Sequence, residues 1–154
     1  MEKSSDSIFL YFSPIIERII EFVDKNAGEF PWAVAAAIRM GVEIIIKTLY
    51  IDLLYPRSTL EEKLDMLFVR KLSFRYVVRK LEEKTGNKNL REKAYLLWLT
   101  SGKYFSSSNF FIKSITERKD ENAIEDVKKM LKELKEVWEL SYIMEKEGIF
   151  SDLK

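Results

Sequence analysis

The sequence predicts an all-α fold, a single domain over residues 1–154 built as a four- to five-helix up-and-down bundle. Gly and Pro are scarce, with five and three residues, whereas a β-sandwich or barrel needs a turn signal about every 8–12 residues. Apolar residues recur every three or four positions over long stretches, which is the spacing of one helix face. Residues that favour helix starts precede most of these stretches. The predicted helices cover residues 14–25, 31–55, 59–85, 90–112 and 122–146.

Two prolines mark the starts of the first two predicted helices. Ser13 and Pro14 form a typical start, because Ser caps a helix well and Pro is tolerated in the first turn. The apolar segment 8–12 before them is expected to form a separate turn. Gly28 ends the first helix, and Pro31 opens the second.

The third predicted helix has clear signals at both ends. Ser58 and Glu61 match a capping box, in which each side chain bonds the other residue's backbone N–H. Gly86 is suited to the left-handed residue that terminates many helices. The apolar face rotates by about a quarter turn in the middle of the segment. This rotation predicts a kink or break near residues 68–71.

The last two predicted helices differ in regularity. Asn89 and Glu92 start the first of them in the same capping style. The run Ser106-Ser107-Ser108 is expected to interrupt it. The final helix, 122–146, keeps the most regular apolar spacing in the chain.

The helix at 31–55 is apolar except for a stripe formed by Arg39, Glu43 and Lys47, which we call the polar seam. These residues are four positions apart and therefore share one face, with Tyr50 beside them. Their charges argue against a membrane span, so we expect the central helix of a bundle. The polar seam is either an internal salt-bridge ladder centred on Glu43 or the lining of an intersubunit cleft. In both cases we expect Glu43 to stabilise the fold or the dimer rather than to catalyse.

Composition excludes several chemistries. The chain has no Cys and no His, which rules out Cys-His and Ser-His nucleophilic systems and the commonest transition-metal ligands. It also has no Gly-rich phosphate-binding loop. We therefore expect no cofactor, no metal and no conventional catalytic residues. Gln is absent while Lys and Glu are abundant, a trend of heat-adapted proteins, and we expect an archaeal source. No secretory signal is evident, so the cytoplasm is the expected location.

Basic residues are concentrated in one part of the chain, although the net charge is only +1. The span 63–93 contains ten Lys or Arg and four Asp or Glu. Within it Lys71, Arg75 and Arg79 are four positions apart and share one helix face, with Tyr76 beside them. Such cations can neutralise phosphates, and an aromatic ring can stack on an unpaired base. The alternative is an ordinary basic face balanced by an acidic one elsewhere.

An apolar helix that carries Glu-x-x-x-Lys, here Glu43 and Lys47, and is followed by further helices resembles the HEPN superfamily of small helical domains. Within it, the chain is similar to the PaREP family of archaeal helical proteins. The tract that carries this similarity is Leu81-Glu82-Glu83-Lys84-Thr85-Gly86-Asn87, followed by Leu90, Ala94, Leu97 and Tyr104-Phe105. The resemblance implies a helical bundle that pairs as a homodimer. Many such domains are RNases, or partners of minimal nucleotidyltransferases in toxin–antitoxin pairs.

The catalytic motif of HEPN RNases is an Arg followed a few residues later by a His, and this chain has no His. The resemblance therefore implies binding without that RNase activity. We expect a homodimer that binds RNA, a nucleotide or a partner protein, with a nucleotidyltransferase as one candidate partner and no membrane association. The candidate dimer contacts are Phe9, Tyr11 and Phe12, or Phe110 and Phe111. The open alternatives are a pure protein-interaction or scaffold module and a metal-independent nuclease that uses Lys, Arg and Tyr.

Overall fold

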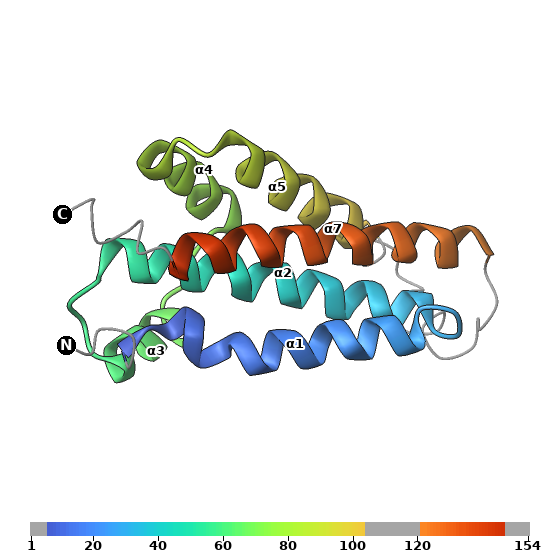
Figure 1. The fold of residues 1–154 in the computed structure, drawn as a ribbon, viewed down its shortest axis with the longest axis horizontal. Coiled ribbons are helices and arrows are strands. Elements are labelled where there is room, and N and C mark those ends of the chain that lie inside the picture. Colours follow the sequence, from blue (N-terminus) through green and yellow to red (C-terminus); the bar gives the residue numbers. More distant parts are fainter. Residues whose placement is uncertain (1–5, 104–120, 147–154) are drawn as a thin grey trace.

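The computed structural model describes residues 6–103 and 121–146, and in these residues all regular structure is helical (Figure 1). The helices are α1 (Ile8–Asn26), α2 (Pro31–Leu54), α3 (Leu60–Phe68), α4 (Phe74–Thr85), α5 (Lys88–Gly102) and α7 (Glu121–Lys146). The all-α prediction is confirmed. The described residues form six helices where four or five were predicted.

The long helices α1, α2 and α7 lie lengthwise side by side, and α4 and α5 form a hairpin against α2 and α7 (Figure 1). α1 and α5 run in one direction, and α2 and α7 run in the opposite one (Figure 1). α2 contacts every other described helix, so its predicted central position is confirmed. An added Cβ at Gly41 of α2 would meet Ile19 of α1 at 3.4 Å and Leu134 of α7 at 3.6 Å. Glycine thus allows these three helices to approach closely.

The predicted start of the first helix at Ser13-Pro14 is wrong. α1 begins at Ile8, with Ser7 as its N-cap, and continues through Pro14. Pro14 has no N–H to offer the carbonyl of Leu10, four residues earlier. The hydroxyl of Ser13 donates to that carbonyl instead, at 3.0 Å. The Ser-Pro pair therefore repairs a helix interior rather than opening a helix.

The predicted third helix, 59–85, is two helices separated by residues 69–73, and the break lies where the apolar face rotates. The capping box is formed by Thr59 and Glu62 rather than by the predicted Ser58 and Glu61. Gly86 has the predicted left-handed conformation, with φ of 73°.

The last two helices were predicted at 90–112 and 122–146. α5 starts two residues earlier than predicted, because Asn87 rather than Asn89 caps it. The predicted remainder of that helix, including the Ser106–Ser108 run, lies outside the described residues. The final helix was predicted to within one residue. In the part of the chain that the structure describes, no helix is long and apolar enough to span a membrane.

Candidate nucleic-acid interface

The polar seam lies between α2 and α5. The carboxylate of Glu43 is 3.7 Å from Nε of Arg39 and 3.4 Å from Nζ of Lys47. It also accepts a 2.7 Å hydrogen bond from the indole Nε1 of Trp98 on α5. These side chains are only 20–32% exposed, so the Glu43 carboxylate has three partners in a partly desolvated site within one chain.

Trp98 is the point where the polar seam meets the α4–α5 hairpin. The guanidinium of Arg39 lies 3.9 Å from the centroid of the indole and donates to the Trp98 carbonyl at 3.3 Å. The indole stacks on Phe74 of α4 at 4.8 Å and, more offset, on Tyr95 of α5 at 6.1 Å. Arg39 packs against Gly102 of α5. A Cβ added at Gly102 would collide with the Arg39 guanidinium, so glycine leaves room for this contact. The polar seam therefore fixes an aromatic group that joins α2, α4 and α5.

Tyr50, predicted beside the polar seam, is 5% exposed and packs edge-on against Tyr76 of α4, with 6.3 Å between ring centroids. Burial, followed by the neighbouring Tyr76, raises the pKa of Tyr50 to about 12. Its hydroxyl therefore stays protonated at physiological pH and cannot act there as a base.

The predicted cations Arg75 and Arg79 border a hollow between α4 and α5 with a volume of about 180 Å³. Arg91 and Tyr95 of α5 complete its lining with Val78 of α4. We call this site the arginine hollow. Tyr95 is the ring that stacks on Trp98, so one wall of the arginine hollow is held by the aromatic group at the end of the polar seam.

The arginine hollow has an excess of positive charge. Its lining includes three arginines and, among the described residues, no carboxylate. Arg91 is held through its Nε by Glu82 at 3.2 Å. Arg75 and Arg79 are exposed and form no ion pair with any residue that the structure describes. Guanidinium groups that share one small site and outnumber the acids beside them attract a multivalent anion.

The other two predicted binding residues lie outside the arginine hollow. Lys71 is exposed in the connection between α3 and α4. Tyr76 is 42% exposed, and Nζ of Lys80 lies 5.7 Å from the centroid of its ring. Tyr95, rather than Tyr76, is therefore the aromatic residue that the structure brings together with Arg75 and Arg79.

Elsewhere the basic span is partly balanced by acids. Lys93 of α5 is 2.9 Å from Glu136 of α7, and this hydrogen bond is the main reason that the pKa of Glu136 is lowered. Lys80 pairs with Glu83 on its own helix at 3.3 Å. Ion pairs with acids thus reduce the positive charge of the span outside the arginine hollow, at Lys80 and Lys93.

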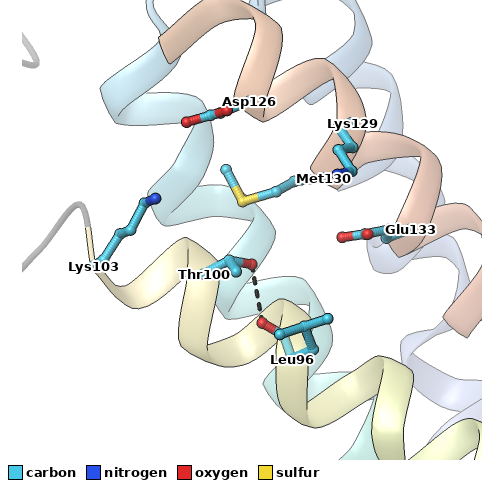
Figure 2. A pocket seen from close by; sticks show the side chains of 7 residues that line it. All are labelled: Leu96, Thr100, Lys103, Asp126, Lys129, Met130 and Glu133. Carbon is cyan, nitrogen blue, oxygen red and sulfur yellow. Dashed lines mark hydrogen bonds between the residues drawn. The ribbon is translucent and has the colours of Figure 1, made fainter. Parts of the chain in front are cut away.

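A second hollow, of about 230 Å³, lies between α5 and α7 (Figure 2). Met130 of α7 points into it, and on the α5 side the Thr100 hydroxyl is bonded to the Leu96 carbonyl at 3.0 Å (Figure 2). Two lysines and two carboxylates stand around it: Lys103, Lys129, Asp126 and Glu133. This balance gives the second hollow no preference for one sign of charge, unlike the arginine hollow.

A buried charged cluster at the end of the bundle was not predicted. Asp52 of α2 and Lys63 of α3 form a 2.9 Å ion pair in which both side chains are at most 5% exposed. Asp52 also accepts from the Ser7 hydroxyl at 2.7 Å and from the backbone N–H groups of Ile8 and Phe9. It thereby neutralises the positive N-terminal end of α1. Burial, followed by the charge of Asp52, raises the pKa of nearby Glu145 to about 8.

The arginine hollow's lining residues on α5 were not predicted, although Arg91 and Tyr95 are four positions apart and therefore share one helix face. The contact of Trp98 with the polar seam had no local signal. Glu43 and Trp98 are 55 positions apart. Within the described residues no group of three or more acids is placed to hold a metal ion. Comparisons of the chain with protein-family models, with curated proteins and with solved structures find no match.

Proposed function

We propose that this chain is a HEPN-like helical domain that binds single-stranded RNA without cleaving it. The observation that carries the proposal is the arginine hollow, where Arg75 and Arg79, which form no ion pair with a described residue, meet Arg91, which is paired with Glu82. The exposed Lys71 continues the row of cations beyond the start of α4.

The chemistry of these side chains suits a phosphate backbone. Arginine presents a planar fork of N–H donors that matches two phosphate oxygens, and it remains charged at every physiological pH. Tyr95 adds a ring whose orientation is held by Trp98 at 6.1 Å. A base can stack on such a ring without a sequence requirement. This combination of cations and an aromatic wall is typical of proteins that bind single strands.

Binding without cleavage is supported by the composition. The chain has neither His nor Cys, so the commonest general base is absent. The phenol of Tyr50 has a pKa of about 12. As a HEPN-like domain, the chain has a minimal nucleotidyltransferase as its proposed partner. In this proposal Glu43 and Lys47 stabilise the fold and do not catalyse.

The test is fluorescence anisotropy with a labelled single-stranded RNA across a salt series. If three arginines contact phosphates, log K falls with log salt with a slope of about −2, from roughly −0.7 for each contact. The variant with Arg75, Arg79 and Arg91 changed to Gln should lose most affinity and most of the salt dependence. Arg75 and Arg79 are exposed and Arg91 is partly exposed, so circular dichroism should show an unchanged helix content.

The matched control changes Lys128, Lys132 and Lys135 to Gln. These residues are exposed on α7. Their substitution removes the same net charge as the arginine variant does, but at another place on the surface. The control should keep most of the affinity, because close contacts rather than total charge dominate. Equal losses of RNA affinity in both variants would indicate nonspecific electrostatic attraction. If the unchanged protein does not bind the RNA in about 50 mM salt, RNA binding is rejected. The protein-interaction module, favoured by the exposed Phe68 (71%) and Val69 (69%), would then replace it.

A further inference from the structure

We propose that the arginine hollow receives a terminal phosphate monoester, such as the 5′-phosphate of an RNA, in preference to the internal phosphodiesters of the chain. This inference rests on the proposed function, because it concerns the same site. It names the part of the ligand that the site selects. The observation behind it is that three guanidinium groups from two helices surround one small hollow.

The size of the arginine hollow favours an end group over a whole ligand. Its volume of about 180 Å³ equals that of roughly six water molecules at ~30 Å³ each. Pockets that enclose a complete small-molecule ligand are larger, at about 300–1,000 Å³. A tetrahedral phosphate therefore fits inside, while the rest of the nucleotide extends toward the solvent and the neighbouring cations.

Charge and geometry favour the monoester. An internal phosphodiester has a single charge and two non-bridging oxygens, whereas a monoester has three free oxygens and about −1.5 to −2 charges at pH 7. Arg75 and Arg79 reach the arginine hollow from α4, and Arg91 reaches it from α5. Glu82 holds Arg91 through its Nε at 3.2 Å, so this guanidinium is oriented before a ligand arrives. Three donor groups can thus serve three oxygens.

The buried Val78 and the stacked Tyr95 make this side of the site rigid. Val78, which is one of the lining residues, is 3% exposed, and Tyr95 is held by its stacking on Trp98. A site whose walls are fixed in advance loses less conformational entropy when a ligand binds. The polar seam contributes to this rigidity, since Glu43 and Arg39 both contact Trp98.

The experiment compares two RNAs of identical sequence that carry either a 5′-phosphate or a 5′-hydroxyl, by anisotropy at pH 7.5. We expect the phosphorylated RNA to bind on the order of tenfold more tightly, the gain from one additional hydrogen bond between charged groups. At pH 5 this preference should largely disappear, because the second pKa of a phosphate monoester is about 6. The 5′-hydroxyl RNA measured at the same two pH values reports any change in the protein, including the Glu82 carboxylate that holds Arg91, so the change in preference reports the ligand.

Variants and competing ligands test whether the preference for the 5′-phosphate arises at the arginine hollow. Arg91→Gln should remove the preference for the 5′-phosphate, and Lys128→Gln, on the exposed face of α7, should retain it. Competition by AMP at the same concentration as the phosphorylated RNA would identify the monoester itself as the recognised group. Competition only by the phosphorylated RNA would identify the RNA end. Both results support the proposal.

Two outcomes overturn it, and they can be told apart. If both RNAs bind equally well at pH 7.5 with a salt-dependent affinity, RNA binding stands and selection of the terminal phosphate is wrong. If neither RNA binds in about 50 mM salt, the proposed function fails and this inference fails with it.

Discussion

Glu145 shows how burial near another carboxylate sets the charge of a single residue. It lies in the last turn of α7, where its Oε2 is 3.1 Å from the Ser7 hydroxyl, and Ser7 also donates to Asp52. Its other oxygen, Oε1, is buried without a hydrogen-bond partner among the described residues. Lys63 balances one negative charge in this cluster, and a second negative charge would be unfavourable. The fold therefore favours the protonated form of Glu145.

This preference makes stability depend on pH. The pKa of Glu145 is about 8 in the fold and 4.5 as its ordinary value, so the folded state binds the proton more tightly. The stabilisation from the proton is complete below pH 4.5 and is lost progressively as the pH rises to about 8. Glu145→Gln imitates the protonated form. It should stabilise the protein by about 1–3 kcal/mol at pH 8, or about 2–4 °C in Tm for each kcal/mol.

Thermal denaturation between pH 5 and pH 8.5 measures this effect. The Gln variant should lose less stability toward high pH than the unchanged protein does. Asp52→Asn is the contrasting control, because it leaves buried Lys63 without its ion-pair partner and should destabilise strongly at every pH, by about 3–5 kcal/mol. A Glu145→Gln variant that is less stable at pH 8 would show that the carboxylate is charged in the fold.

At the scale of elements, α1 shows that a helix can contain a sequence that normally starts one. The interior Pro14 removes one backbone hydrogen bond, and Ser13 supplies another donor to the Leu10 carbonyl. The burial of Ile8, Phe9 and other apolar residues of the first turns fixes α1 on the core. Apolar burial thus overrides the local preference of proline.

A double-mutant cycle at these two positions tests this account. Pro14→Ala supplies a backbone N–H at position 14 that can donate to the Leu10 carbonyl, and it removes the steric conflict of the ring. We therefore expect a stabilisation of about 1–2 kcal/mol. Ser13→Ala should destabilise the unchanged protein by about 1 kcal/mol. In the Pro14→Ala background the same change should be almost neutral. Urea denaturation of the four proteins gives the coupling. Equal costs of Ser13→Ala in both backgrounds would contradict the role assigned to Ser13.

At the scale of the whole molecule, apolar surface remains outside the bundle. Phe9 and Phe12, expected at a dimer contact, are core residues with 1% and 7% exposure. Tyr11 between them is 52% exposed, and Phe68, whose ring is 6.2 Å from that of Phe12, is 71% exposed. Phe110 and Phe111 lie outside the described residues. The part of the predicted contact that the structure leaves on the surface is thus the area around Tyr11.

We expect the protein to form a two-fold symmetric homodimer in solution, the commonest closed assembly, using this area. Multi-angle light scattering at micromolar concentration should give twice the mass of the chain. Tyr11→Glu combined with Phe68→Glu should give the monomer mass without loss of helicity, because both side chains are exposed. Leu96→Glu, at a 55% exposed position on α5, should leave the dimer intact. A monomer mass for the unchanged protein would reject the prediction.

Much of the secondary structure could be predicted because its signals lie within one or two helical turns. The apolar spacing of α2 and α7 and the glycine that ends α4 are local features, and their positions agree with the structure within one or two residues. The predicted starts that were wrong involve competing candidates a few positions apart, such as Ser58 against Thr59. The cap is the residue whose side chain reaches a free backbone N–H, and here the Thr59 hydroxyl accepts from the N–H of Glu62 at 3.2 Å.

The sequence by itself determined an all-α chain with a central apolar helix, a charged stripe upon it, a concentration of basic residues in one span, and the absence of His and Cys chemistry. These properties depend on composition and on periodicity, which need no knowledge of neighbours in space. Only the tertiary structure decided that Glu43 meets Trp98, that Asp52 meets Lys63 and the first turn of α1, and that Arg91 faces Arg75 and Arg79 across one hollow. Each of these pairings depends on the rotation and offset of packed helices, and a shift of one residue turns a side chain by about 100°.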